Sequence, residues 1–186
     1  SKEKMKELRK ELQIIFQDPY ESLNPRMTVS QAIQAPLIIQ KIYKASDRVG
    51  LEKKTHEMMD LVGLARRVAN SYPHELDGGR RQRIGIARAL ALNPKFIVCD
   101  EPVSALDVSI QAQVLNLMQD LQQQLGLTYM FITHDLSVVK HLSSSIVVMY
   151  LGQMVEQGTP EQLFNDPRHP YTKALLSAIP IPDPEK

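Results

Sequence analysis

The amino-acid sequence predicts an α/β fold in which a parallel sheet is joined to a helical subdomain and a proline-rich C-terminal extension. Between residues 96 and 151, short apolar runs alternate with helical patterns, which is typical of parallel strands with crossover helices. Residues 28–69 instead show helical periodicity without a clear strand. The tail, residues 167–186, holds five of the twelve prolines. These observations indicate, in turn, the sheet, the subdomain and the extension.

The first half of the chain is predicted to be mainly helical. Residues 1–11 are charged and compatible with a helix, and they are expected to be a solvated lead-in. The expected elements are a strand at 13–16, helices within 28–69 that stop near Gly63, and a helix from 80 to about 92. Pro19 ends the strand region, because proline cannot donate to a sheet ladder and disfavours a helical residue before it. Asn93-Pro94 ends the last helix.

The second half alternates strands and helices. The non-alternating apolar run 96–99 predicts a strand buried on both faces, and residues 109–125 show the clearest helical period, with Gly126 as its stop. The remaining expected elements are strands at 127–133, 146–151 and 153–157, a helix at 135–142, a helix opened by the capping box Thr159-Pro160-Glu161-Gln162, and a short helix at 172–177.

Composition narrows the function classes. Hydrophobic residues make up 43% of the 186 residues, enough for a core. The formal net charge is +1, whereas a protein held to nucleic acid by bulk charge is usually more basic. The single cysteine, Cys99, excludes an intrachain disulfide and indicates a reducing compartment. The longest apolar run, 146–151, has six residues, against the roughly 20 that a membrane helix needs.

Two adjacent carboxylates, Asp100 and Glu101, follow the apolar run 96–99. In open α/β sheets, ligands bind at the carboxyl ends of the strands. One carboxylate there can hold Mg²⁺, and the other can orient and deprotonate an attacking water. For this pair taken alone, a solvated turn or a helix cap is an equal alternative.

Two further segments are compatible with phosphate binding. Leu76-Asp77-Gly78-Gly79-Arg80 opens a helix, where paired glycines and the helix N-terminus suit an anion; a plain glycine turn explains the segment equally well. His134 follows the strand expected at 127–133. It could donate a hydrogen bond to a γ-phosphate, although a lone histidine in such a place is more often structural.

In their order and spacing, these residues resemble the motifs of the nucleotide-binding domains of ABC-type ATPases. The matches are the Q-loop Gln17, a signature loop at 76–80, a Walker B stretch at 96–101, a D-loop at 104–107 and the switch His134. Segments 16–25 and 169–176 are similar to the oligopeptide and dipeptide importer subfamily, the second of them to its C-terminal extension.

The resemblance implies a P-loop NTPase-type parallel sheet, of which this chain holds the C-terminal part. It implies four parts: residues 1–19 as the end of a core strand and the Q-loop, 20–92 as a helical subdomain with the signature loop and helix, 93–158 as the C-terminal part of the ATPase core, and 159–186 as the peptide-importer extension.

The resemblance also implies the site residues. Glu101 would polarise the attacking water, and His134 would sense the γ-phosphate. The other implied residues are Asp100 and Gln17 for Mg²⁺, Asp77, Gly78, Gly79 and Arg80 facing the ATP of a partner subunit, and Ser104 and Asp107 of the D-loop.

The implied function is ATP hydrolysis that powers the uptake of oligopeptides or dipeptides, with ATP and Mg²⁺ as cofactors. The implied partners are a second ATPase subunit, transmembrane permease subunits and, indirectly, a substrate-binding protein, with no nucleic acid. The implied location is peripheral, on the cytoplasmic face of the plasma membrane.

Two departures from the family pattern leave an alternative open. No G-x-x-x-x-G-K-[ST] phosphate loop occurs in the 186 residues, so the chain is expected to be a fragment that is inactive alone. Asp77 and Arg80 replace the usual serine and glutamine of the signature. A carboxylate about 4 Å from a phosphate costs on the order of 4 kcal/mol at an effective dielectric of ~20, unless Arg80 neutralises it. The alternative is a non-catalytic interaction or regulatory module with a degenerate signature loop.

Overall fold

A computed structural model describes residues 2–18 and 22–178. The chain divides into two compact units, Ser1–Ile132 and Thr133–Lys186, and each is described by itself. The expected division into four parts, with boundaries after residues 19, 92 and 158, remains a prediction. Pro19 and Tyr20, which contributed to the sequence argument, lie outside the described residues, as does the end of the proline-rich tail. Among the helices described, none combines the length and the apolar character that crossing a membrane requires.

The first unit contains a three-stranded parallel sheet, which confirms the predicted fold class. Its strands are β1 (Leu12–Ile15), β2 (Phe96–Asp100) and β3 (Thr128–Ile132), in the order β1-β2-β3. The register pairs Ile15 with Cys99 and Asp100 with Ile132. The carboxyl ends of all three strands therefore meet at one edge of the sheet.

The two faces of this sheet differ in their coverage. On one face Ile15, Ile97 and Cys99 are at most 2% exposed and join a core with apolar residues of α5 (Gly78–Leu90) and α6 (Val108–Leu125). Side chains on the other face remain substantially exposed, including Ile14 at 40% and Met130 at 46%. Burial therefore alternates along β2, and the expectation that this strand is buried on both faces is wrong: Ile97 and Cys99 are buried, whereas Val98 on the other face is only partly buried.

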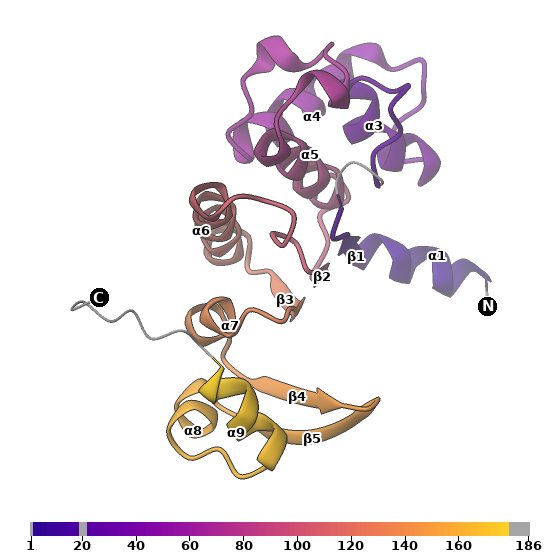
Figure 1. The fold of residues 1–186 in the computed structure, drawn as a ribbon. Helices are drawn as coiled ribbons and strands as arrows, with labels where there is room; N and C mark the ends of the chain where they lie inside the picture. Colours follow the sequence, from indigo (N-terminus) through magenta and orange to yellow (C-terminus); the bar gives the residue numbers. More distant parts are fainter. Residues whose placement is uncertain (1, 19–21, 179–186) are drawn as a thin grey trace. The chain divides into compact units, whose positions relative to one another are not determined.

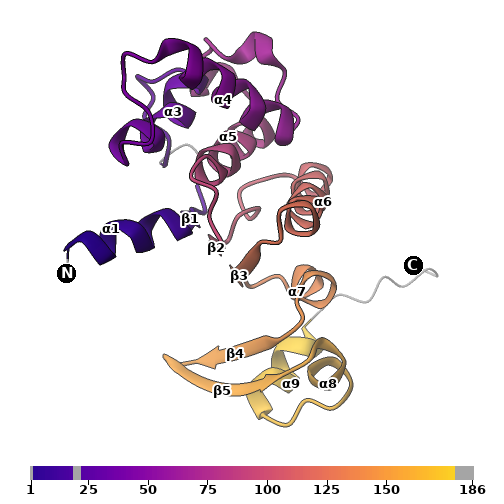
Figure 2. The ribbon, with the colours of Figure 1, turned by 180° about the vertical axis from the view of Figure 1, so that it is seen from behind.

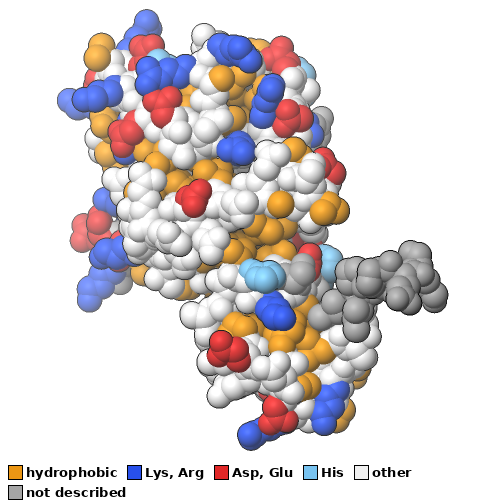
Figure 3. Space-filling model, turned by 90° about the vertical axis from the view of Figure 1, so that its left-hand side faces the viewer, with side chains coloured by type: hydrophobic (Ala, Val, Ile, Leu, Met, Phe, Trp, Pro, Cys, Tyr) orange, Lys and Arg blue, Asp and Glu red, His pale blue; other side chains and the backbone are white. Residues whose placement is uncertain are grey.

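A group of helices precedes β2 in the first unit (Figures 1 and 2). It comprises α3 (Val29–Ile39), α4 (Arg48–Leu61), the short helices Arg66–Val68 and Pro73–Glu75, and α5. Helix α4 ends where predicted, because Gly63 adopts a left-handed φ of +67°. On the face drawn in Figure 3, the basic side chains over these helices are interspersed with acidic ones rather than gathered in one patch.

Capping residues set the helix boundaries that the sequence left approximate. Helix α5 begins at Gly78, two residues before the expected start, because Asp77 takes its N-cap. Asp107 caps α6, and Gly126 ends it with a φ of +64°. The charged N-terminal segment, which the sequence indicated only as compatible with a helix, forms α1 (Lys2–Glu11).

The second unit corrects one topological expectation. The strand predicted at 146–151 does not extend the parallel sheet: β4 (Ile146–Tyr150) pairs antiparallel with β5 (Gln153–Gly158). Leu151 and Gly152 both have positive φ, 48° and 76°, and such a two-residue turn closes a hairpin. The unit also contains α7 (Leu136–Leu142), α8 (Pro160–Asn165) with the predicted capping box at Thr159, and α9 (Pro170–Ser177).

Candidate functional site

The edge of the sheet at the strand ends brings Gln17 and Glu101 together. Gln17 follows β1 and Glu101 follows β2, and the two strands are parallel neighbours. The Gln17 Nε2 group donates a hydrogen bond to Glu101 Oε2 at 2.8 Å. Asp100 is the last residue of β2. We call these three residues the carboxylate edge.

The backbone of Glu101 is held in an uncommon conformation. Its φ is +43°, a left-handed value that costs a non-glycine residue roughly 1–3 kcal/mol. The Glu101 N–H donates to the Ile132 carbonyl at 2.8 Å, and the Glu101 carbonyl accepts hydrogen bonds from the Ser104 N–H at 3.2 Å and the Ser104 hydroxyl at 3.1 Å. Ser104 therefore supports the turn that presents the Glu101 carboxylate.

Asp100 is suited to a divalent cation by its position in the strand. Side chains alternate along β2, so Asp100 lies on the open face of the sheet, opposite to Cys99. Mg²⁺ typically takes one or two carboxylates and completes its shell with water and substrate phosphates. The oxygen donors of Asp100, Glu101 and Gln17 fit this preference. No cluster of three or more His, Cys, Asp or Glu side chains able to bind a metal occurs among the described residues.

At the start of α5, the side chain of Asp77 caps the helix and forms an ion pair with Arg80. Asp77 Oδ1 accepts a hydrogen bond from the Arg80 N–H at 2.8 Å, and Arg80 Nε lies 3.2 Å from Asp77 Oδ2. Both side chains are more than half exposed, so the pair contributes at most ~1 kcal/mol as a salt bridge. The Asp77 carboxylate nevertheless occupies the position where the helix N-terminus would favour an anion.

The paired glycines that begin α5, Gly78 and Gly79, have a packing role that sequence reasoning missed. A Cβ at Gly79 would lie 2.6 Å from Ile110 Cγ2, and one at Gly78 would lie 3.0 Å from Leu106 Cδ2. Glycine at both positions therefore lets α5 approach α6 and the loop before it. The expected close approach of a ligand is not needed to explain them.

Comparison with known proteins follows this geometry. Residues 1–104 match the family described as ABC transporter, and residues 155–186 match the oligopeptide/dipeptide transporter C-terminal region. The chain belongs to the ABC transporter family. It is 57% identical over its whole length to the oligopeptide transport ATP-binding protein OppF of Bacillus subtilis, of which it covers 60%. It is 55% identical to the dipeptide transport ATP-binding protein DppF of Escherichia coli, with 95% of this chain and 52% of that protein covered. The chain thus spans between half and two thirds of these relatives.

Solved ABC structures share the fold. The structure of cbiO1 from Clostridium perfringens, described as part of the ABC transporter complex cbiONQ, aligns with a TM-score of 0.76 at 26% identity, over 89% of this chain and 64% of that one. The ATP-binding cassette MJ0796, a dimer bound to ADP and Pi in a post-hydrolysis state, aligns with a TM-score of 0.70 at 29% identity, over 86% and 68% of the two chains.

Two further motif residues of this ABC-family chain, Asp107 and His134, lie in different units. Asp107 caps α6 by accepting hydrogen bonds from the Ser109 hydroxyl at 2.8 Å and the Ile110 N–H at 3.1 Å. These bonds lower the pKa of the Asp107 carboxyl. His134 is exposed and belongs to the second unit, and its expected contact with the γ-phosphate remains a prediction.

The nearest match to a phosphate loop, residues 50–55, lies inside α4 and is helical. Thr55 is 1% exposed; its hydroxyl donates to the Leu51 carbonyl at 2.7 Å and accepts from Gln34 Nε2 at 2.9 Å. Both partners are internal to the helical group. This segment is therefore part of the core rather than a phosphate cradle.

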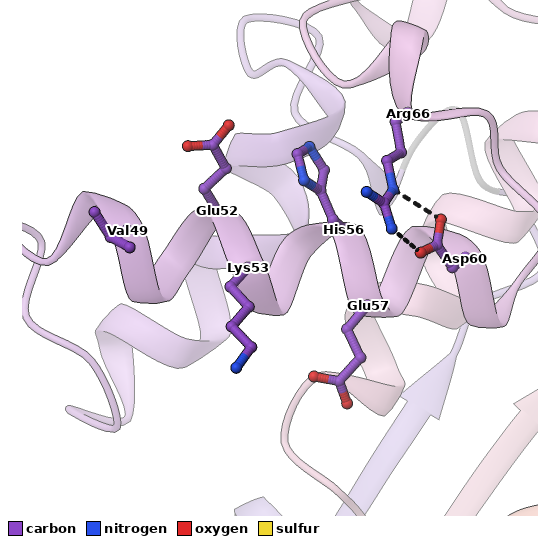
Figure 4. Close-up of a pocket in the computed structure, with 7 residues that line it drawn as sticks. All are labelled: Val49, Glu52, Lys53, His56, Glu57, Asp60 and Arg66. Atoms are coloured by element: carbon purple, nitrogen blue, oxygen red, sulfur yellow. Dashed lines mark hydrogen bonds and ion pairs between the residues drawn. The ribbon is translucent and has the colours of Figure 1, made fainter.

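Two hollows among the described residues of the first unit lie away from the carboxylate edge. One, about 650 Å³, runs along α4, where Arg66 and Asp60 face each other while Lys53 and Glu57 leave the helix on the side opposite to Glu52 and His56 (Figure 4). A smaller hollow of about 270 Å³ adjoins Asp77 and Arg80.

Sequence reasoning also missed how the importer-type tail is anchored. Glu156 of β5 accepts hydrogen bonds from the backbone N–H groups of Arg168, at 2.7 Å, and His169, at 3.0 Å. His169 Nδ1 accepts from the Tyr171 N–H at 3.1 Å and caps α9. The centroids of the Tyr171 and Tyr150 rings are 4.4 Å apart. The His-Pro-Tyr-Thr segment therefore has a structural role within the second unit.

Proposed function

We propose that this chain is part of an ATP-hydrolysing subunit that powers peptide import. The observation that carries the proposal is the hydrogen bond of 2.8 Å between Gln17 and Glu101 at the ligand-binding edge of a parallel sheet, beside Asp100. The names of the relatives, oligopeptide and dipeptide transport ATP-binding proteins, support the substrate class. Because the chain spans only part of those relatives, activity is expected of the whole protein.

Each residue of the carboxylate edge has a distinct proposed role. The Glu101 carboxylate accepts a proton from, and orients, the water that attacks the γ-phosphate. Gln17 fixes the direction of that carboxylate through its amide N–H and keeps its amide oxygen for the metal or the water. Asp100 holds Mg²⁺, directly or through water, and the ion neutralises charge on the phosphates when bound.

The proposed partners are a second ATPase subunit and transmembrane permease subunits, with a substrate-binding protein acting through the permease. The dimeric state of the MJ0796 structure and the complex described for cbiO1 support this arrangement. The protein would then lie peripherally at the cytoplasmic face of the plasma membrane. His134 would contact the γ-phosphate, and residues 77–80 would face the nucleotide of the second subunit.

A second candidate function is supported by one observation. Asp77 and Arg80 pair with each other at the start of α5, which favours a subunit whose signature loop engages ATP weakly. In a pair of different ATPase subunits, the composite site served by this loop would be impaired, and the site using this chain's own Glu101 would remain active.

The test is Glu101→Gln in this chain joined to the N-terminal segment of the Bacillus subtilis relative. Glutamine keeps the shape but cannot accept a proton, so single-turnover ATP hydrolysis should fall by about 100-fold or more while ATP binding changes little. Glu52→Gln, an exposed residue of α4, is the matched control and should hydrolyse ATP at the parent rate. Hydrolysis by the Glu101 variant within about threefold of the parent would remove Glu101 from the mechanism.

A further inference from the structure

Two arginines of α5 make the same kind of contact with different parts of the chain. Arg88 Nη1 donates to the Ser22 carbonyl at 2.6 Å, and Arg83 Nη1 donates to the Val62 carbonyl at 2.7 Å. Both guanidinium groups are partly buried. A charged donor to a backbone carbonyl away from bulk water is among the stronger hydrogen bonds. The two contacts differ in the residue that accepts the bond. Arg83 binds Val62, the C-cap of α4, whereas Arg88 binds Ser22, which follows Gln17 in the chain.

The Ser22 carbonyl is connected to Gln17 by a short path. The Ser22 N–H donates to the Asp18 carbonyl at 3.1 Å, and Asp18 is the neighbour of Gln17. The next residue, Leu23, is 2% exposed and belongs to the same core as α5. The segment is thus anchored at Ser22 and Leu23. Beyond Asp18, the Gln17 side chain reaches Glu101 Oε2 at 2.8 Å.

We propose that Arg88 is a positioning residue for Gln17: by fixing the Ser22 carbonyl to α5, it keeps the Gln17 amide on the Glu101 carboxylate. Helix α5 supplies a firm support, since Ile84, Ile86 and Ala87 are fully buried. The guanidinium remains charged inside the protein, and burial restricts the directions in which it can donate. The consequence for hydrolysis rests on the proposed function, whereas the positional link does not.

The side-chain amide protons of Gln17 provide a direct readout in this chain. Glu101→Gln removes the charged acceptor of this bond, so the Gln17 amide signals of the parent and of the Glu101→Gln variant should differ in ¹H–¹⁵N spectra recorded at one pH. We call this difference the Glu101-dependent shift. The Gln17→Met variant assigns the signals by their loss.

When Arg88→Met is present in both members of that pair, the Glu101-dependent shift of the Gln17 amide should fall by about half or more, and Arg88→Lys in its place should restore part of it. Arg83→Met, which removes an equivalent bond elsewhere on α5, should leave the shift at the parent value. If Arg88→Met does not fold, the comparison of Arg88→Lys with Arg83→Lys decides, with a smaller shift expected only for Arg88→Lys.

A parent-like shift in the Arg88 variants, or an equal loss in the Arg83 variants, would overturn the positional link. The readout involves no nucleotide. Its failure would therefore leave the proposed hydrolysis intact, and a failure of the hydrolysis experiment would leave this result unchanged.

Discussion

The carboxylate edge and the start of α5 both place carboxylates where a phosphate-bearing ligand could bind. The two regions differ in the groups that contact these carboxylates. At α5, Asp77 is met by the Arg80 backbone N–H and by its guanidinium group. At the carboxylate edge, Glu101 is oriented by the Gln17 amide on a strained backbone. Strain of this kind persists where the surrounding structure enforces it, and it clusters at active sites. The difference indicates that the carboxylate edge is arranged to bind a ligand, whereas the carboxylate at the start of α5 is already bound by Arg80 of the same helix.

The largest expected effect concerns nucleotide affinity. Residues 1–186 contain no glycine-rich phosphate loop with its lysine. In nucleotide-binding proteins that have this loop, it supplies most of the contacts to a triphosphate. Calorimetry of this chain with Mg-ATP should show no binding at micromolar concentrations. A micromolar dissociation constant would mean that the carboxylate edge or the α5 start binds ATP unaided.

The next prediction separates packing from ligand binding at the start of α5. Gly79→Ala should destabilise the protein by roughly 1–3 kcal/mol, because its Cβ would lie 2.6 Å from Ile110 Cγ2. Gly85→Ala in the same helix meets nothing within 4 Å and should stabilise by about 0.5–1 kcal/mol. Urea unfolding of both variants measures this. Equal effects would show that the packing argument for Gly79 is wrong.

A smaller effect tests whether Asp77 acts as a helix cap. Asp77→Ala should cost about 1 kcal/mol of unfolding free energy, whereas Asp77→Ser retains a capping oxygen and should cost only a few tenths. Thermal unfolding of the two variants distinguishes them. If alanine is tolerated as well as serine, the carboxylate does not close this helix.

The smallest effect is the pH dependence of the neighbouring cap, Asp107. Hydrogen bonds from the Ser109 hydroxyl and the Ile110 N–H hold its pKa below the ordinary value of 3.8. Its charge therefore stabilises the folded state above about pH 4, and this contribution is lost as pH falls through the lower folded pKa. The difference in thermal midpoint between the parent and Asp107→Asn should shrink over this range. A difference independent of pH would contradict the assignment.

Local patterns predicted much of the fold because the relevant signals are themselves local. The strand 96–99, the helix 109–125 and the capping box at Thr159 follow from apolar periodicity and side-chain chemistry. The start of α5 could have been predicted more closely, since aspartate is a preferred N-cap. The pairing of β4 was missed because the parallel and antiparallel alternatives give the same apolar run, and only the turn at Leu151-Gly152 distinguishes them.

The candidate site was predicted by motif but not by contact. The order of Gln17 and Glu101 in the sequence indicated two site residues, whereas the hydrogen bond between them depends on the register of β1 and β2. The contact of Arg88 with Ser22 joins residues far apart in the chain, and nothing in an arginine-rich helix distinguishes it from Arg83. Such contacts depend on tertiary packing and could not be read from spacing.

Ion binding followed in ¹H–¹⁵N spectra, with Mg²⁺ and with inorganic phosphate, tests the contrast between the carboxylate edge and the start of α5 most directly. In ¹H–¹⁵N spectra of this chain, Mg²⁺ should shift the signals of Gln17 and Asp100, the two residues proposed to hold the ion. Inorganic phosphate should leave the Gly78 and Gly79 amides unchanged in the parent and shift them in the Asp77→Ser, Arg80→Gln double variant. Saturable phosphate shifts at Gly78 and Gly79 in the parent, with no response of the carboxylate edge to Mg²⁺, would contradict the account.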